Sequence, residues 1–409
     1  MYQQQNIPLS KGAVIILLVL VLISSTFAMW ARPTAVPLNR LLQNVDNYIA
    51  KNPKDAQGYY VRGRLHSLAY AKGTRDLEMY DVSTNKLPNF PSYESIMTNR
   101  EGKFQWSKAA KDHLEASIRD FQKATELDPR NAMSFLGLGW VLEDGAQFAK
   151  LTKAFPKERK PQGATAFWQE HALVAYRKAY QLTINADLKS EHFGPGANAA
   201  ISREAGERIL ALLRNRKVSE AESLEIAQIE KNIEEIEKKP RAITPIIFPL
   251  DAPTPLSNLL ATDQRVRFDL AGDGKPTIWP WVKPNVGILV WDPKHSGRIV
   301  SGQQLFGSVT WWISWENGYQ PLAMLDNDGD GWLAGKEMNG LAVWVDVNAN
   351  GISDPGEVKP VLAYSIMRIA VRNAADNFSA PTNERGIQLH DGRFLPTYDW
   401  TPTEIRPNH

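Results

Sequence analysis

The 409-residue chain contains no cysteine. This absence excludes thiol catalysis, structural disulfides, cysteine-ligated zinc or iron–sulfur sites and a lipidated N-terminal cysteine. The chain also lacks an excess of charge of one sign, because 47 Lys and Arg face 45 Asp and Glu, a net charge of +2. Neutralising phosphates requires a concentrated basic surface, so this balance argues against nucleic-acid binding.

Familiar catalytic motifs are missing as well. The seven histidines are scattered, and there is no His-Glu-x-x-His pair, Gly-x-Ser-x-Gly elbow or phosphate-binding glycine loop. We therefore expect a binding or structural protein and not an enzyme. A hydrolase that uses two carboxylates stays open as an alternative, because such residues need not be close along the chain.

The N-terminus carries a hydrophobic segment. Residues 12–31 have no charge, and residues 13–23 are all aliphatic. The aliphatic run fits a secretory signal that is cleaved near Thr26-Phe27-Ala28, whereas the whole run has the length of about 20 residues that spans a bilayer. We assign residues 1–36 as a signal anchor or signal peptide and favour a transmembrane helix. Residues 37–409 are then exported, either anchored to the membrane or secreted.

Residues 37–239 are predicted to be helical and contain a repeated pattern. Gly63 follows Tyr59 by four positions, just after an Asn-Pro pair. Gly139 follows Phe135 by four positions, just after an Asp-Pro pair. Small residues at such places let two helices approach closely. The pattern resembles tetratricopeptide repeats over about residues 40–215, which implies helical hairpins that bind a protein or peptide partner. An unrelated α-helical bundle is the alternative.

A last helix and a proline-rich stretch end this region. Ile226, Ile229, Ile233 and Ile236 form a narrow stripe that favours docking onto the preceding helices, with a coiled-coil seam as the alternative. Prolines then follow at positions 245, 249, 253 and 255. This density predicts an extended linker over residues 240–260, without a central strand. Residues 261–409 form the next predicted domain.

The first strong motif is a twelve-residue loop, residues 326–337, called the first loop below. Oxygen-bearing side chains stand at positions 1, 3, 5 and 12, which are Asp326, Asp328, Asp330 and Glu337. A glycine stands at position 6, and Trp332 at position 7 is expected to offer its backbone carbonyl. Calcium takes six to eight oxygens at about 2.3–2.6 Å, and this spacing wraps such a set around one ion.

A second loop, residues 346–357, repeats the spacing. Its predicted ligands are Asp346, Asn348, Asn350, the carbonyl of Ile352, Asp354 and Glu357. Residues 323–357 hold seven acidic side chains and one basic one, which is costly without cations. Acidic turns without metal are the alternative. Only residues 338–345 separate the loops, which leaves no room for the helices of a calcium sensor, so we predict two structural calcium ions.

The surrounding motifs sharpen this interpretation. A Phe-Asp loop at residues 268–274 and an Asp loop at residue 292 precede the two complete loops. This order, over about residues 265–372, resembles the EF-hand-like calcium-binding module of bacterial repeat-in-toxin-type secreted proteins. Asp269 and Asp273 match that pattern, with Ala271 replacing a carboxylate, so a weak third calcium site is possible there. Lys294 inside the Asp292 loop would repel a cation, and that loop is predicted to be vacant.

Nine of the thirteen tryptophans lie from residue 279 onward. They are expected to fill the core of a small domain, with a sugar-stacking platform as the alternative. An alternating stretch around Asp391-Gly392 predicts a β-hairpin. The expected fold is multidomain: an N-terminal hydrophobic helix, an all-α helical-hairpin domain, then a small α+β calcium-loop domain with a C-terminal β-hairpin. The expected function is a membrane-anchored calcium-binding adaptor, with a calcium-stabilised envelope hydrolase or a carbohydrate-binding module as alternatives.

Overall fold

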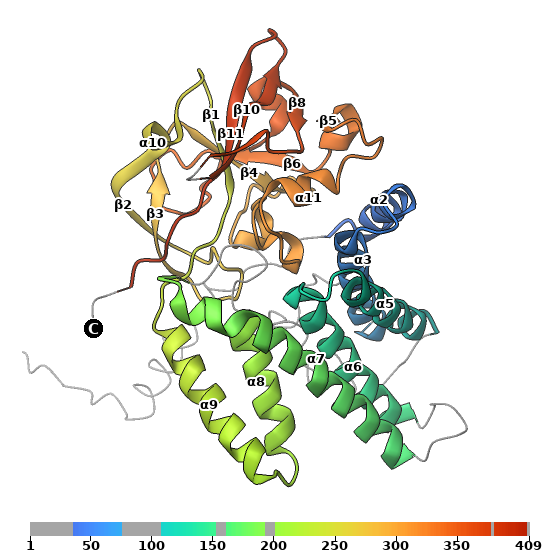
Figure 1. The fold of residues 1–409 in the computed structure, drawn as a ribbon. Coiled ribbons are helices and arrows are strands. Elements are labelled where there is room, and N and C mark those ends of the chain that lie inside the picture. Colours follow the sequence, from blue (N-terminus) through green and yellow to red (C-terminus); the bar gives the residue numbers. More distant parts are fainter. Residues whose placement is uncertain (1–35, 76–107, 153–160, 193–200, 378–379, 407–409) are drawn as a thin grey trace, which may run out of the picture.

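The computed structural model describes residues 36–75, 108–152, 161–192, 201–377 and 380–406. Within this part of the chain a helical region comes first and a region built on an antiparallel sheet follows (Figure 1). The helices are α2 (Leu38–Lys51), α3 (Ala56–Arg75), α5 (Lys108–Leu127), α6 (Ala132–Thr152), α7 (Pro161–Lys189), α8 (Ile201–Arg214) and α9 (Glu220–Glu237).

Consecutive helices pack against each other through glycines, among them Gly139, which the sequence pattern singled out. A Cβ placed on Gly139 of α6 would lie 2.4 Å from a ring carbon of Tyr176 on α7. A Cβ on Gly137 would lie 2.3 Å from the ring of Phe121 on α5. Any side chain at these positions would overlap an aromatic ring, so glycine sets the separation of both helix pairs.

The helix α9 closes this region by docking. Ser219 and Glu222 form a reciprocal capping box at its start, which satisfies exposed backbone N–H groups. Ile229 and Ile236 are buried, and α9 packs against α8 and α7. The docking interpretation of the isoleucine stripe is confirmed, and the coiled-coil alternative is not needed.

The sheet region contains a nine-stranded antiparallel sheet in the order β5-β8-β10-β11-β1-β4-β6-β7, with β9 paired to β10. A separate two-stranded sheet joins β2 and β3. The strands are β1 (Ile246–Pro249), β2 (Leu260–Phe268), β3 (Thr277–Val282), β4 (Val286–Trp291), β5 (Trp332–Ala334), β6 (Leu341–Trp344), β7 (Val358–Pro360), β8 (Ile366–Ala370), β9 (Ala375–Asn377), β10 (Ala380–Leu389) and β11 (Phe394–Asp399). Two short helices, α10 (Leu256–Leu259) and α11 (Tyr319–Ala323), complete it. The hairpin expected around Asp391-Gly392 is confirmed as β10 and β11.

The prediction that residues 240–260 exclude a central strand was wrong. Strand β1 lies between β11 and β4, and all four of its residues are buried. Pro245 and Pro249 stand just before the strand and at its last residue, whereas Ile246, Ile247 and Phe248 between them keep their N–H groups. Prolines at the ends of a strand leave the interior of its hydrogen-bonded ladder intact.

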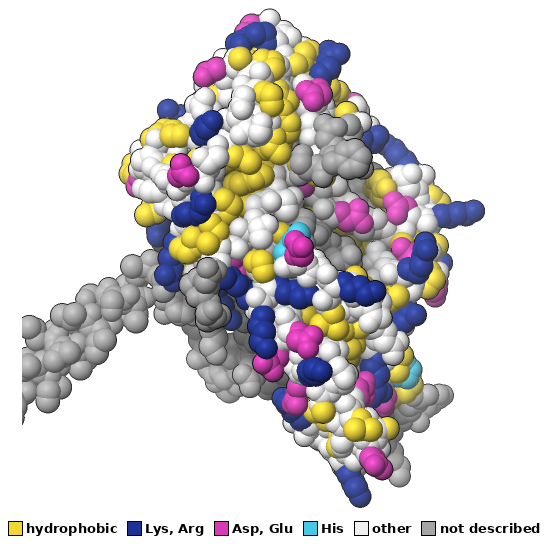
Figure 2. Space-filling model, turned by 60° about the vertical axis from the view of Figure 1, so that its left-hand side comes forward, with side chains coloured by type: hydrophobic (Ala, Val, Ile, Leu, Met, Phe, Trp, Pro, Cys, Tyr) yellow, Lys and Arg dark blue, Asp and Glu magenta, His cyan; other side chains and the backbone are white. Residues whose placement is uncertain are grey.

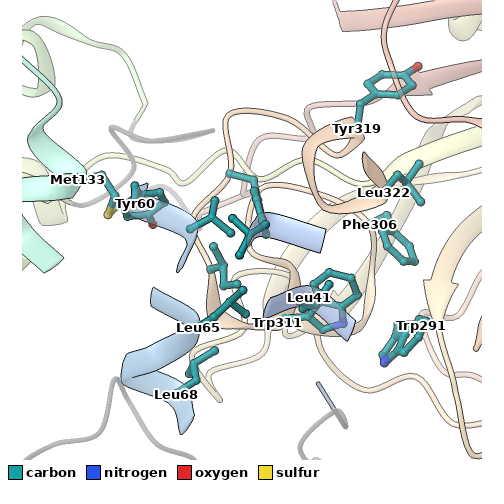
Figure 3. Packing of buried hydrophobic residues seen from close by; sticks show 14 of the residues in the cluster. Leu41, Tyr60, Leu65, Leu68, Met133, Trp291, Phe306, Trp311, Tyr319 and Leu322 are labelled. Atoms are coloured by element: carbon teal, nitrogen blue, oxygen red, sulfur yellow. The ribbon is translucent and has the colours of Figure 1, made fainter. Parts of the chain in front are cut away.

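One hydrophobic core continues from the helical region into the sheet region. Leu41, Leu65 and Leu68 of α2 and α3 belong to the same buried cluster as Trp311 and Leu322. Figure 3 shows Leu41 close to Trp311, with Leu322 and Phe306 beyond. The two regions are therefore joined by side-chain packing as well as by the connecting chain.

The expected transmembrane helix requires a correction. Among the described residues, no helix combines the length and the apolar character needed to cross a bilayer. The hydrophobic run at residues 12–31 lies outside the described residues. On the face that Figure 2 displays, Lys and Arg side chains are interspersed with Asp and Glu, as the balanced composition implies.

Candidate metal centre

The two loops occupy different places in the sheet region. The first loop begins after α11 and contains β5, so its second half is part of the large sheet. The second loop connects β6 directly to β7, which pair with each other. The segment between the loops is a 3-10 turn and a strand, and no helix separates them.

The aspartate at position 1 braces each loop in a similar way. In the second loop, Asp346 accepts the N–H groups of Asn350 at 3.0 Å and Gly351 at 2.8 Å, one on each carboxylate oxygen. In the first loop, Asp326 accepts the N–H groups of residues 329 and 331 at 2.7 and 2.9 Å. The glycines at position 6 have φ of +90° and +73°, a conformation that costs glycine little. A sharp turn at position 6 is therefore present in both loops.

The glutamate at position 12 closes each loop by the same pair of bonds. Glu337 accepts the N–H of position 2 at 2.6 Å and that of position 9 at 3.2 Å. Glu357 accepts the N–H groups of the same two positions, both at 2.9 Å. Each glutamate thus points back across its loop toward the aspartate at position 1. The two loops differ at most positions, yet their closing glutamates make the same two hydrogen bonds.

The remaining predicted ligands gather inside these frames. In the first loop, carboxylate oxygens of Asp326, Asp328 and Asp330 lie within 4.8 Å of one another. In the second loop, the amides of Asn348 and Asn350 both donate to one oxygen of Asp354, at 2.8 and 3.0 Å. The side chains at positions 3 and 5 each accept the N–H two residues further on.

The two residues predicted to offer backbone carbonyls have different surroundings. Trp332 begins β5, and the guanidinium of Arg368 lies 4.1 Å from the centroid of its ring. Ile352 has an exposed side chain, and its carbonyl accepts the N–H of Asp354 at 3.0 Å. The structure therefore brings the side-chain ligands together more clearly than the carbonyls.

The electrostatics of the loops favour a bound cation. Burial raises the pKa of Asp326, and the nearby carboxylates of Glu337 and Asp330 raise it further. Burial also raises the pKa of Asp346, with Glu357 adding to the effect. A cation among these oxygens would stabilise the charged form of both carboxylates and so lower both pKa values. The predicted ligands are carboxylate, amide and carbonyl oxygens, which are the kind of ligand that a hard ion such as Ca²⁺ takes.

Tryptophans hold the second loop from the core side. The indole N–H of Trp281 donates to Asp346 at 2.7 Å, and that of Trp344 lies 3.4 Å from Glu357. Asp346 is 1% exposed and Glu357 is 5% exposed, whereas Asp328 and Asp330 in the first loop are exposed. The contact of Trp281 was not predictable from the sequence, because this residue lies on β3, far from the loop along the chain.

In the Asp269 loop the aspartate at position 1 again accepts two backbone N–H groups, but one of the two predicted ligands is already paired. Asp269 accepts the N–H groups of Asp273 and Gly274, both at 3.1 Å. Burial, followed by the charge of Asp273, raises the pKa of Asp269 to about 7. Asp273 itself forms an ion pair with Arg241 at 2.8 Å, so a guanidinium already neutralises it. Sequence reasoning missed Arg241, which lies far from the loop along the chain.

The Asp292 loop keeps the same turn without the ligands. Asp292 accepts the N–H groups of Ser296 and Gly297 at 2.9 and 2.8 Å, and Lys294 is exposed. At the closing end, Gln303 donates to the carbonyl of Gly272 instead of turning an oxygen inward. The fold thus contains four turns of one kind, and among these four only the first and second loops carry oxygen-bearing side chains at all of positions 1, 3, 5 and 12 without a lysine or alanine among them.

Two alternative sites receive less support. The tryptophans at 279, 281, 291, 311 and 315 are buried, which confirms a core role and removes them as a sugar platform. A cavity of about 710 Å³ between α2 and α11 includes Asp55 and Glu316, two carboxylates outside the loops. Asp55 already accepts the Tyr48 hydroxyl and the Gln57 N–H, and Glu316 accepts Gln320. These bonds are structural and indicate no acid–base pair.

Comparison with known proteins finds similarity over parts of the chain. A family model described as the SPM domain matches residues 255–394, which contain all four Asp loops. The iron-regulated protein FrpA of Neisseria meningitidis serogroup C is 36% identical over 107 residues, which cover 25% of this chain and 10% of that protein. The chain thus spans about a tenth of the length of this curated relative.

Proposed function

We propose that this protein is an exported calcium-binding adaptor. Its first and second loops each hold one calcium ion in an EF-hand-like manner, and the ions brace the sheet region. Its helical hairpins, which resemble tetratricopeptide repeats, bind a protein or peptide partner. The aliphatic run at residues 13–23 supports export.

One observation carries the calcium proposal. Both loops, which share few identical residues, fold their position-12 glutamate onto the N–H groups of positions 2 and 9. Around that frame the first loop gathers three aspartate carboxylates within 4.8 Å of one another, and in the second loop the amides of Asn348 and Asn350 both donate to Asp354. Ordinary acidic turns need no such closing glutamate, and the repetition supports a shared ligand.

When bound, calcium would supply a compact positive charge that offsets the mutual repulsion of these carboxylates. Asp326, Asp328, Asp330 and Glu337 would hold the ion of the first loop. Asp346, Asn348, Asn350, Asp354 and Glu357 would hold that of the second loop. The chain's contribution is to keep these oxygens facing inward through the backbone bonds described above.

The test is titration calorimetry of the full chain with calcium, after treatment with a chelator. Wild type should bind two ions, and Glu337→Gln and Glu357→Gln should each weaken one site strongly. The double variant should bind neither ion tightly. Asp251→Asn, a change at an exposed acid outside the loops, is the matched control and should behave as wild type.

The binding should also stabilise the fold. Extracellular modules of this kind bind calcium at about 10⁻⁴–10⁻³ M. At 100 times the dissociation constant, each independent site adds about 2.7 kcal/mol to the free energy of unfolding. Magnesium should replace calcium poorly, because it requires ligands in a nearly ideal octahedron at shorter distances. An absence of binding heat together with an unmoved melting temperature would show that the loops are turns only.

The adaptor part of the proposal has a separate test. The full chain is immobilised and exposed to proteins of its host, with and without calcium. If the helical hairpins form the binding surface, a protein partner should be retained in both conditions. Retention that disappears when the helical surface is altered, but survives Glu337→Gln and Glu357→Gln, supports this division of roles. Loss of the partner in the loop variants alone would assign binding to the sheet region.

A further inference from the structure

Helix α2 belongs to the helical region, yet one of its side chains holds both ends of the first loop. The guanidinium of Arg40 donates through Nη2 to the carbonyl of Leu325, just before the loop, and to that of Glu337 at 3.0 Å, the last residue of the loop. Its Nε donates at 3.0 Å to the side-chain oxygen of Asn327, at position 2. One planar donor group therefore joins the entry, the second residue and the exit of the loop.

A second side chain of α2, one turn further on, repeats this contact. The amide of Asn44 donates to the carbonyl of Met324 and to Asn327, both at 2.9 Å. Asn44 is buried at the junction. The N–H of Asn327 in turn donates to Glu337, the residue that closes the loop. The contacts of α2 thus reach the closing glutamate through Asn327.

The helix that carries these residues is itself firmly docked. Leu41 and Val45, on the same side of α2, are buried in the core that continues into the sheet region. Figure 1 shows α2 at the edge of the helical region that faces the segment carrying β5. The SPM match begins only at residue 255, so the contacts come from outside the matched domain.

From these contacts we infer that Arg40 and Asn44 are positioning residues for the first calcium site, and that calcium at this site strengthens the docking of α2. The inference rests on the proposed calcium function. It follows from linkage: if docked α2 holds the loop in its binding form and raises calcium affinity, calcium must favour docking by the same factor. The second loop has no contact with α2 among the hydrogen bonds of the described residues and serves as an internal reference.

The test uses variants that remove the hydrogen bonds without changing charge. Asn44→Ala deletes the amide, and Arg40→Lys keeps the positive charge but loses the forked donor. Each is made in the Glu357→Gln background, where only the first site remains, and in the Glu337→Gln background, where only the second remains. Calcium affinity of the first site should fall about 5-fold or more, within the 5- to 150-fold range of ordinary coupling. Affinity of the second site should stay unchanged.

A matched control addresses general damage to the helical region. Arg177 of α7 donates through two nitrogens to Glu225 of α9, at 2.8 and 2.6 Å, and the hydrogen bonds of the described residues do not join Arg177 to α2 or to either loop. Arg177→Lys loses this pair of bonds and should leave the affinity of the first site unchanged. Equal losses in Arg177→Lys and Arg40→Lys would overturn the assignment of a specific positioning role.

The reciprocal effect has its own readout in amide hydrogen exchange of α2. In Glu357→Gln, calcium should increase the protection of α2 by a factor similar to the affinity loss in Asn44→Ala. In Glu337→Gln, calcium should leave α2 unchanged. Calcium that binds both loops while α2 protection and the Asn44→Ala affinity stay constant would overturn this inference alone. An absence of calcium binding in wild type would instead refute the proposed function.

Discussion

The first and second loops share a spacing and a hydrogen-bond scheme, but they are built into the molecule differently. The second loop faces the core, where Trp281 and Trp344 contact its acids. The first loop is open to solvent along Asp328 and Asp330 and is held at its ends by a helix from another region. Spacing therefore determines which oxygens converge, whereas the surroundings determine what a bound ion would stabilise.

The largest expected effect contrasts the two position-1 aspartates. Asp346→Ala would leave two buried donors without their partner, the indole N–H of Trp281 and the backbone N–H of Gly351. Each such loss costs about 1–3 kcal/mol, so we expect a decrease of about 3–5 kcal/mol in the free energy of unfolding. Asp326→Ala should cost about 1–2 kcal/mol, because water reaches the freed donors of the first loop. Urea unfolding in chelator measures both, and equal losses would contradict the comparison.

A second prediction separates the acids of the two loops, whose raised pKa a bound cation would lower, from Asp399, whose raised pKa calcium would not change. Asp399 is completely buried, and neither of its oxygens makes a well-formed hydrogen bond to a described residue. Burial raises its pKa to about 7, which the nearby Gly318 N–H and Thr244 hydroxyl only partly offset. Because the folded pKa lies above the unfolded value, this contribution to stability is complete below about pH 4 and is lost as the pH rises toward 7.

The loss should approach 1.4 kcal/mol for each pH unit, or about 2–3 kcal/mol between pH 5 and pH 7. Asp399→Asn should remove this part of the pH dependence, and calcium should not. Metal-free Asp326 and Asp346 shift in the same direction, but calcium should cancel their part. Chemical unfolding across this pH range, with calcium or chelator, distinguishes the two classes. If calcium changed the part of the pH dependence that Asp399→Asn removes, this distinction between Asp399 and the loop acids would be contradicted.

The smallest expected effect concerns one indole. Trp281→Phe keeps most of the buried ring but deletes the donor to Asp346. We expect a loss of about 1 kcal/mol in stability and a weaker second calcium site, with the first site unchanged. Trp332→Phe, in the first loop, is the matched control and should not affect the second site. Titration of each variant with calcium checks both statements.

Much of the local structure was predictable from the sequence. Loop positions 1, 5, 6 and 12 act within a dozen residues, so their spacing alone defines the turn and its closure. Gly139, which meets Tyr176, was marked by its distance of four positions from Phe135. The β10–β11 hairpin was marked by its turn. In each case the interacting residues are neighbours or follow a short period.

Contacts between distant segments were not predictable. Arg40 reaches the first loop across 285 or more positions, and Arg241 reaches Asp273 from the start of the supposed linker. Strand β1 was missed because its prolines were counted without regard to their place at its ends. Such features depend on which segments the fold brings together, and a single sequence carries no periodic signal for that.

The sheet order has a consequence for solubility. The two outermost strands of the nine-stranded sheet are β5 and β7, each three residues long. One lies within the first loop and the other begins where the second loop ends. An exposed edge strand has unpaired N–H and C=O groups that other chains can bind, and a very short edge strand has few of them. Besides β9, which pairs only with β10, the two ends of the sheet are thus short strands next to acidic loops, an arrangement that disfavours edge-to-edge joining with the sheet of a neighbouring molecule.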